Sequence, residues 1–153
     1  MKKLSFVIQK HDTVRAHFDF RLEINGVMPS WAIPKGFQDD PKEKRLAMKT
    51  PDHPLDYRKF EGEIPEGEYG AGKVAIFDEG TYIPEIEITK GVREEVKGDD
   101  GEKVMADGIK KGEVKFLLKG KKYKGSFALF KTKGFPPGRS ENAWLLIKHK
   151  DEQ

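Results

Sequence analysis

Glycine and proline interrupt this chain at intervals of about eight to twelve residues, which leaves little room for long helices. Between these interruptions, polar and apolar residues often alternate with the period of two that a strand with one buried face requires. The spacing therefore predicts an all-β fold, either a barrel or a sandwich. With 153 residues the chain has the length of one domain, and we expect residues 1–153 to form a single core.

Nine strands are expected from this pattern, at residues 4–10, 17–24, 30–34, 45–50, 73–79, 81–88, 112–120, 124–132 and 143–149. Asn25-Gly26 is the strongest short hairpin signal, and residues 120–122 indicate a second tight turn. Residues 51–72 are rich in proline and glycine, and we interpret them as a long loop with a functional role. Residues 91–112 are the best helix candidate, but their charge favours a polar excursion with a turn or two of helix.

The composition excludes several classes of protein. Because the chain has no cysteine, it has neither disulfide bonds nor thiolate zinc sites, and a reducing cytoplasm is the expected compartment. No apolar run approaches the ~20 residues of a membrane-spanning helix, so we expect no membrane partner.

The net charge of +3 conceals two regions of opposite charge. Residues 77–109 contain ten acidic and four basic side chains, whereas residues 110–150 contain twelve basic and two acidic ones. Such a lysine-rich half can bind a phosphate backbone through its charge. An ordinary solvated surface would give the same run of charges.

The segment HDTVRAHFDFR, residues 11–21, lines up chemically active side chains on an expected strand. From His17 onward, alternate residues point to opposite faces. One face is apolar, with Phe18, Phe20 and Leu22, and the other is polar, with His17, Asp19 and Arg21. His11, at the end of the preceding strand, can fold back toward the polar face.

Two imidazoles and one carboxylate, from His11, His17 and Asp19, can hold one divalent ion such as Mn²⁺, Zn²⁺ or Fe²⁺. Three protein ligands leave open positions on the ion, as catalytic sites require. The alternative is a polar strand face that is simply exposed to water. Arg21 continues the same face, where its guanidinium could bind phosphate oxygens or instead form an ion pair with Glu23 or a neighbouring residue.

Four further residues are candidates in the first half of the chain. His53 lies on a stiff stretch between Pro51 and Pro54, and a histidine can protonate a leaving oxygen near neutral pH. Tyr57 could add a hydroxyl group to the same pocket. Lys35 and Arg45 are further cations. Each of these could equally be an ordinary surface residue.

One apparent motif is rejected. Residues 67–73, GEYGAGK, fit the glycine and lysine spacing of a phosphate-binding P-loop. That loop needs a following Ser or Thr and a helix, but Val74 follows and the sequence continues as a strand. A glycine-rich hairpin turn is the better interpretation.

Several segments together resemble the 3′-phosphoesterase domain of bacterial and archaeal DNA ligase D. They are FVIQKHD, HFDFRLEINGVMPSWAIPKG, RLAMKTPDHPLDYRKFEGEIPEGEYGAG and NAWLLIKHKDE. The resemblance is dense over residues 6–78 and returns over about 113–152. Because the chain carries neither a polymerase nor a ligase module, the expectation is a free-standing, archaeal version, in which the acidic segment 83–111 affects substrate access.

This resemblance implies a compact single-domain β-barrel with long Pro/Gly-rich loops and a polar catalytic groove that holds one Mn²⁺, with Co²⁺ or Zn²⁺ as other possible ions. By position, the metal ligands are His11, His17 and Asp19. The residues that engage the scissile phosphate are Arg21, His53 and Tyr57. Supporting phosphate or strand contacts are assigned to Lys35 and Arg45.

The resemblance further implies a hydrolase that acts in DNA repair by non-homologous end joining. Such an enzyme removes a 3′-terminal ribonucleoside from a DNA or RNA-containing primer-template and then removes the 3′-phosphate, which leaves a ligatable 3′-OH. A separate ATP-dependent DNA ligase and a repair polymerase are the implied partners. Two alternatives stay open: a non-catalytic β-barrel that binds 3′ ends, and a metal-dependent hydrolase of small phosphoesters.

Overall fold

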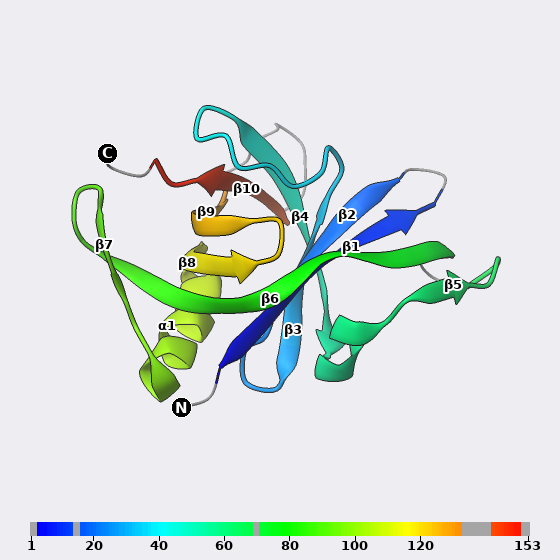
Figure 1. Cartoon of the computed structure of the whole chain (residues 1–153), viewed down its shortest axis with the longest axis horizontal. Coiled ribbons are helices and arrows are strands. Elements are labelled where there is room, and N and C mark those ends of the chain that lie inside the picture. Colours follow the sequence, from blue (N-terminus) through cyan, green and yellow to red (C-terminus); the bar gives the residue numbers. More distant parts are fainter. Residues whose placement is uncertain (1–2, 14–15, 69–70, 133–141, 151–153) are drawn as a thin grey trace.

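The computed structural model describes residues 3–13, 16–68, 71–132 and 142–150, and the statements below refer to these residues (Figure 1). They form ten strands, one α-helix and one 3-10 helix. The strands are β1 (Leu4–Asp12), β2 (His17–Leu22), β3 (Val27–Ile33), β4 (Lys44–Pro54), β5 (Gly62–Ile64), β6 (Gly72–Thr89), β7 (Val92–Glu95), β8 (Glu113–Gly120), β9 (Lys124–Lys131) and β10 (Ala143–Lys148). The helices are the 3-10 helix η1 (Leu55–Lys59) and α1 (Gly98–Lys111).

Eight of these strands close into a ring. Hydrogen-bonded neighbours follow the order β1-β2-β3-β4-β10-β9-β8-β6, and β6 pairs back onto β1. The strands β5 and β7 pair with β6 outside the ring. Every pairing among the described strands is antiparallel. The all-β prediction is therefore confirmed.

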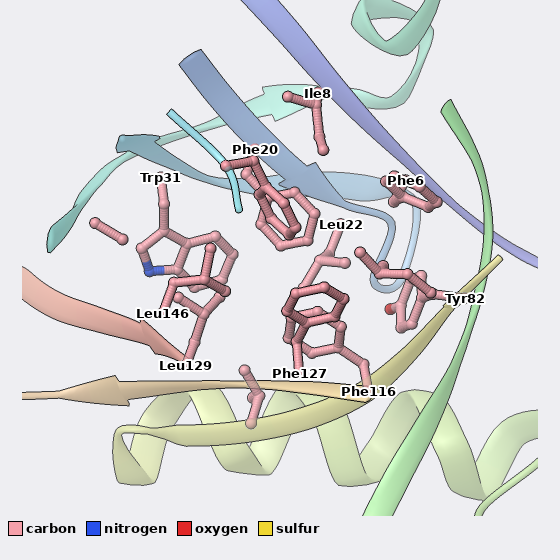
Figure 2. Packing of buried hydrophobic residues seen from close by; sticks show 14 of the residues in the cluster. Phe6, Ile8, Phe20, Leu22, Trp31, Tyr82, Phe116, Phe127, Leu129 and Leu146 are labelled. Carbon is pink, nitrogen blue, oxygen red and sulfur yellow. The ribbon is translucent and has the colours of Figure 1, made fainter. Parts of the chain in front are cut away.

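The interior of the ring is filled with aromatic and aliphatic side chains (Figure 2). Phe20 lies near its centre, with its ring centroid 5.6 Å from that of Phe116 and 6.4 Å from that of Trp31. Phe20 and Leu22 point into this core, whereas Asp19 and Arg21 lie on the outer face of the same strand. The alternation of β2 thus fixes both the core and the position of the polar side chains.

Both predicted tight turns are confirmed. Asn25 and Gly26 have φ angles of 51° and 82°, as a type I′ turn requires, and they connect β2 to β3. The turn between β8 and β9 is held from the side by Asp78, which is buried. Its carboxylate accepts backbone N–H bonds from Lys121, Lys122 and Tyr123 at 2.9–3.0 Å.

The two strands predicted at residues 73–79 and 81–88 are one continuous strand, β6. Gly80, the residue between the two predicted strands, lies inside β6 opposite Gly120 of β8. A side chain at Gly80 would collide with the backbone oxygen of Lys119. The glycine therefore permits a close approach of two strands and does not end either of them.

The helix candidate at residues 91–112 is confirmed, but the expectation of only a turn or two was wrong, because this region forms β7 and the 14-residue helix α1. Gly101, Met105 and Ile109 recur at helical spacing; Gly101 is buried, Met105 belongs to the core and Ile109 packs against it. Gly112 ends the helix in the left-handed conformation, with φ of 91°. The high charge and the glycines of this segment concealed a narrow apolar stripe. Among the described residues, no helix has the length and apolar character needed to cross a bilayer.

The long loop predicted for residues 51–72 is largely structured. The strand β4 continues to Pro54, η1 follows directly, and β5 pairs with the start of β6. Residues 72–73 begin β6, so a strand follows the P-loop-like segment, as expected, and residues 69–70 of that segment lie outside the described residues.

Candidate metal centre and phosphate site

The pairing of β1 with β2 brings the predicted metal ligands together. In this antiparallel register His11 lies opposite His17, and Gln9 lies opposite Asp19. Directly opposed residues point to the same face of a sheet. All four side chains therefore lie on the outer face of the ring.

Asp19 lies between the two imidazoles. Its Oδ1 is 3.2 Å from Nε2 of His17, and its Oδ2 is 3.4 Å from Nδ1 of His11. One donor atom from each of the three residues lies within 4.8 Å of the others, which is close enough to share an ion. The donor set of two nitrogens and one oxygen, without a thiolate, suits Mn²⁺, Co²⁺ or Zn²⁺.

The alternative of a polar face exposed to water is wrong for this strand. Asp19 is 7% exposed, Arg21 3% and His11 7%. Buried charges are normally paired or bound to a metal, because removing them from water costs free energy. Burial raises the pKa of Asp19, but the hydrogen bond from His17 and the charge of Arg21 outweigh it, so the pKa lies below its ordinary value. Asp19 is therefore a carboxylate at neutral pH.

Arg21 is held by hydrogen bonds on all three of its nitrogens. Its Nε donates to Oε1 of Gln9 at 2.6 Å, one Nη donates to Oγ of Ser30 at 2.9 Å, and the other lies 3.4 Å from Oδ2 of Asp19. The ring of Tyr57 lies over the guanidinium, with 4.8 Å from Cζ to the ring centroid. The suggested ion pair of Arg21 is therefore formed with a neighbour, Asp19, and not with Glu23.

His53 reaches this site through an irregularity between β3 and β4. Met28 pairs with His53 and Ser30 pairs with Thr50, so three steps on β4 match two on β3, with Pro29 at the irregularity. Strict alternation would send Thr50 and His53 to opposite faces. The register shift instead brings both to the outer face, where both line the same cavity.

Nδ1 of His53 lies 3.1 Å from an Nη of Arg21 and 3.0 Å from the backbone oxygen of Pro51. The guanidinium can only donate and the carbonyl can only accept, so the two contacts require opposite protonation of Nδ1. Burial lowers the pKa of His53, and the charge of Arg21 lowers it further. The neutral ring is therefore favoured, and its Nδ1 accepts from Arg21 in one tautomer and donates to Pro51 in the other.

Tyr57 is carried by η1, which Gln9 fastens to the sheet. Nε2 of Gln9 donates to the backbone oxygens of Tyr57 and Phe60, at 3.0 and 3.1 Å. The ring centroids of Tyr57 and His53 are 4.7 Å apart. Burial raises the pKa of Tyr57 despite the opposing charge of Arg21, so its hydroxyl group stays protonated.

These side chains surround a cavity of about 880 Å³. It is lined by His11, His17, Asp19, Arg21, His53 and Tyr57, together with other residues of β3, β4, β5 and the loops beside them. Lys35 and Arg45 do not line it. Lys35 is exposed in the turn after β3, and Arg45 donates to Oε2 of Glu43 at 2.7 Å. Their assignment to phosphate or strand contacts stays a prediction.

Two residues of the site were missed in the sequence. Gln9 and Ser30 are fully buried and both bind Arg21. Gln9 lies two residues before His11, so the alternation of β1 could have identified it as a neighbour. To place Ser30 opposite Arg21, the pairing of β2 with β3 has to be followed residue by residue outward from the Asn25-Gly26 turn.

Comparison with known proteins agrees with this geometry. Residues 9–131 match the family described as the DNA ligase D 3′-phosphoesterase domain. The chain is 42% identical over 150 residues to the multifunctional non-homologous end joining protein LigD of Pseudomonas aeruginosa. It is 42% identical over 149 residues to the corresponding DNA repair protein of Mycobacterium tuberculosis, and 41% over 148 residues to that of Mycolicibacterium smegmatis.

Each of these matches covers 97% of this chain but only 15–17% of the relative. The chain thus spans about a sixth of the length of the curated relatives it matches. The matched residues include the triad, Arg21, His53 and Tyr57. By the extent of both comparisons, the chain belongs to the 3′-phosphoesterase domain family of DNA ligase D.

Proposed function

We propose that this chain is a metal-dependent hydrolase that removes a 3′-phosphate, and a 3′-terminal ribonucleoside, from primer-template ends to leave a 3′-OH. The observation that carries the proposal is the convergence of His11, His17 and Asp19 beside Arg21 and His53 in one cavity. An anionic phosphoester needs positive charge around its oxygens, and this arrangement supplies it from two directions.

His11, His17 and Asp19 would hold the ion, for which we propose Mn²⁺, with Co²⁺ or Zn²⁺ as other candidates. When bound, such an ion supplies positive charge for a phosphate oxygen and makes a water molecule more acidic. The ionised Asp19 is suited to this role, since its low pKa keeps it from protonating near neutral pH.

Arg21 would stabilise the charge on the phosphate. A guanidinium has five N–H donors, and the contacts described here engage four of them, with Gln9, Ser30, Asp19 and His53. These bonds fix the plane of the guanidinium before substrate binds. Arg21 is therefore preorganised, and binding costs little side-chain entropy.

His53 would protonate the departing oxygen or bind the phosphate. When His53 takes up a proton, Nδ1 can donate to Pro51 but can no longer accept from Arg21. From the tautomer that accepts from Arg21, protonation thus releases one donor of Arg21 for the phosphate, while Nε2–H of His53 stays available as a second donor. The protonated hydroxyl group of Tyr57 would add a further hydrogen bond to the same anion.

The test is phosphate release from a 3′-phosphorylated primer-template, with and without Mn²⁺. We expect release that depends on the metal and produces a 3′-OH, and its loss in Asp19→Asn. A matched control is Asp107→Asn, which makes the same change on the exposed side of α1. Equal activity in both variants would discard the proposed metal centre.

Other outcomes identify the two alternatives. Tight binding of the 3′-phosphorylated end without turnover under any divalent ion would indicate a non-catalytic binding module. Equal rates on a free mononucleotide 3′-phosphate and on the primer-template would indicate a hydrolase of small phosphoesters.

The names of the relatives suggest the cellular setting. Proteins matched here are named for non-homologous end joining, so we propose that this chain processes DNA ends in that pathway. Its 3′-OH product is what an ATP-dependent DNA ligase and a repair polymerase require, and we propose these as its partners. The cytoplasmic location stays a prediction.

A further inference from the structure

We propose that one end of the strand ring is the surface that binds the nucleic acid next to the reacting 3′ end. This surface consists of an aromatic rim and the lysines around it. The rim contains the half-buried rings of Phe18, Phe77 and Tyr123, together with Phe37, which is buried and packs against Tyr123. The inference rests on the proposed function for the identity of the substrate, but it concerns residues outside the catalytic cavity. The sequence alone allowed phosphate-backbone binding by the whole lysine-rich segment 110–150, and the structure narrows this assignment to a surface of named residues.

The aromatic rim is a chain of touching rings from four different parts of the fold. Ring centroids are 4.9 Å apart for Phe18 and Phe77, 6.4 Å for Phe77 and Tyr123, and 4.8 Å for Tyr123 and Phe37. The turn after β3 closes the rim, since a methyl group on Gly36 would lie 3.1 Å from the ring of Phe18. Phe18, Phe77 and Tyr123 are half-buried, so each keeps part of its ring accessible.

Lysines surround this rim. Lys10 lies opposite Phe18 in the β1–β2 pairing, so its exposed side chain points to the same side as Phe18. The ammonium group of Lys122 lies 3.6 Å from the ring centroid of Phe77. Lys121 adjoins it in the β8–β9 turn, and Lys35 precedes Gly36, which packs against Phe18.

The exposed acidic groups near this surface are fewer than its lysines. The carboxylate of Asp78 is buried and accepts backbone N–H bonds, including those of Lys121 and Lys122. Burial is the largest cause of the raised pKa of the Tyr123 hydroxyl, and the negative charge of nearby Asp39 raises it further. The four exposed lysines lie beside three exposed aspartates, which are Asp12 on the same face of β1 as Lys10, and Asp39 and Asp40 after the turn that carries Lys35. Positive charge interleaved with accessible rings is the chemistry that binds phosphates and stacks on nucleotide bases.

The rim also lies next to the proposed reaction. His17 and Phe18 are adjacent in β2 and point to opposite faces, so the metal ligands and the rim occupy the two sides of one strand end. The acidic part of the chain lies elsewhere: β7 and α1 are at the left of Figure 1, and the tips of β1 and β2 are at the right. A strand whose 3′ end enters the cavity can thus continue over the rim without meeting the acidic region.

The test measures binding without turnover, with a fluorescent primer-template bearing a 3′-phosphate in EDTA. Lys121→Gln combined with Lys122→Gln should weaken binding about ten-fold and reduce the slope of log affinity against log salt by about 1.8. The control pair is Lys90→Gln with Lys103→Gln, which removes the same charge from exposed positions near the β6–β7 turn and on α1. It should change the affinity less than two-fold and leave the salt slope nearly unchanged.

A second variant separates stacking from charge. Phe77→Leu keeps an apolar side chain but removes the ring, and it should weaken binding about five-fold at every salt concentration with no change of slope. Thermal unfolding of each variant shows whether the fold is retained. If Phe77→Leu does not fold, the Lys121 and Lys122 double variant alone decides whether the proposed surface is correct.

Equal weakening by the two lysine pairs, or by neither, would overturn the proposed surface. Its failure is distinct from failure of the proposed function. If the wild-type chain releases no phosphate with any divalent ion, but the Lys121 and Lys122 variants still lose binding, the surface stands and the hydrolase proposal falls. If phosphate is released and binding is insensitive to these lysines, the hydrolase proposal stands and the surface falls.

Discussion

The six residues of β2 alternate between an inner and an outer face, and different forces hold the side chains of the two faces. On the inner face, Phe20 and Leu22 are fully buried among other apolar side chains, and their burial stabilises the ring. On the outer face, Asp19 and Arg21 are almost as buried, but they are charged and need each other and their neighbours to offset desolvation. The inner face therefore stabilises the fold. On the outer face, the desolvation of charged groups costs part of that folding free energy, and their mutual contacts hold these groups in fixed positions.

The largest effect is expected on the inner face. Phe20→Ala should lower the free energy of unfolding by about 3–5 kcal/mol, because it leaves a cavity at the centre of the aromatic core. Urea denaturation measures this loss. Activity per folded molecule should stay close to that of the wild type. A loss below about 1 kcal/mol would show that the two faces do not differ as described.

Asp19→Asn tests the outer face. It should reduce phosphate release more than about a hundred-fold, because metal catalysis contributes several kcal/mol to transition-state stabilisation. The fold should be retained, since the amide has the same shape and can still accept a hydrogen bond from Arg21. Turnover and urea denaturation are measured on the same sample. If Asp19→Asn unfolds the protein and the remaining folded molecules keep normal turnover, the proposed difference between the two faces is wrong.

Ser30→Ala asks how far the outer face depends on the support of Arg21. The Oγ of Ser30 accepts from Arg21 at 2.9 Å and donates to the backbone oxygen of Met28 at 2.8 Å. Its removal should reduce turnover about two- to ten-fold, the value of one hydrogen bond. Metal affinity, measured by calorimetry, should not change. Ser126→Ala, on β9, is the matched control for loss of a buried hydroxyl group.

The smallest effect is the pH dependence of stability that His53 contributes. Its pKa is lowered by burial and by Arg21, so the folded protein binds this proton less readily than the unfolded chain does. Its contribution is present above the ordinary pKa of about 6.5 and is lost as pH falls through the lower pKa of the folded state.

The measurement compares wild type with His53→Gln in metal-free buffer from pH 8 to pH 5. The wild type should lose stability relative to the variant below about pH 6.5. The opposite trend would mean that folding favours the protonated ring. Phe20→Ala should show no such pH-dependent difference, since that substitution changes no titratable group.

Much of this arrangement could be predicted from the sequence because β-strands have a strict period. The alternation around Phe20 separated core from site, Asn25-Gly26 set the β2–β3 turn, and the spacing of His17 and Asp19 predicted the ligand pair. These features depend on residues close together in the chain. The structure brings these ligands together as predicted.

Features that depend on long-range pairing were not predictable in the same way. The face on which His53 lies is set by the irregularity at Pro29, which is visible only when β3 and β4 are paired. Gly80 looks like a break in isolation, and its role appears only opposite Gly120. The apolar stripe of α1, by contrast, was present in the sequence and was outweighed by its charges.

The three proposed metal donors all come from the paired strands β1 and β2, within residues 11–19. A loop this short loses little chain entropy when it closes, so contacts within it form early during folding. The contact between Arg21 and His53 instead joins residues 32 positions apart and must wait for β4 to pair with β3. During refolding, the capacity to bind a cation should therefore appear before the capacity to bind a phosphate.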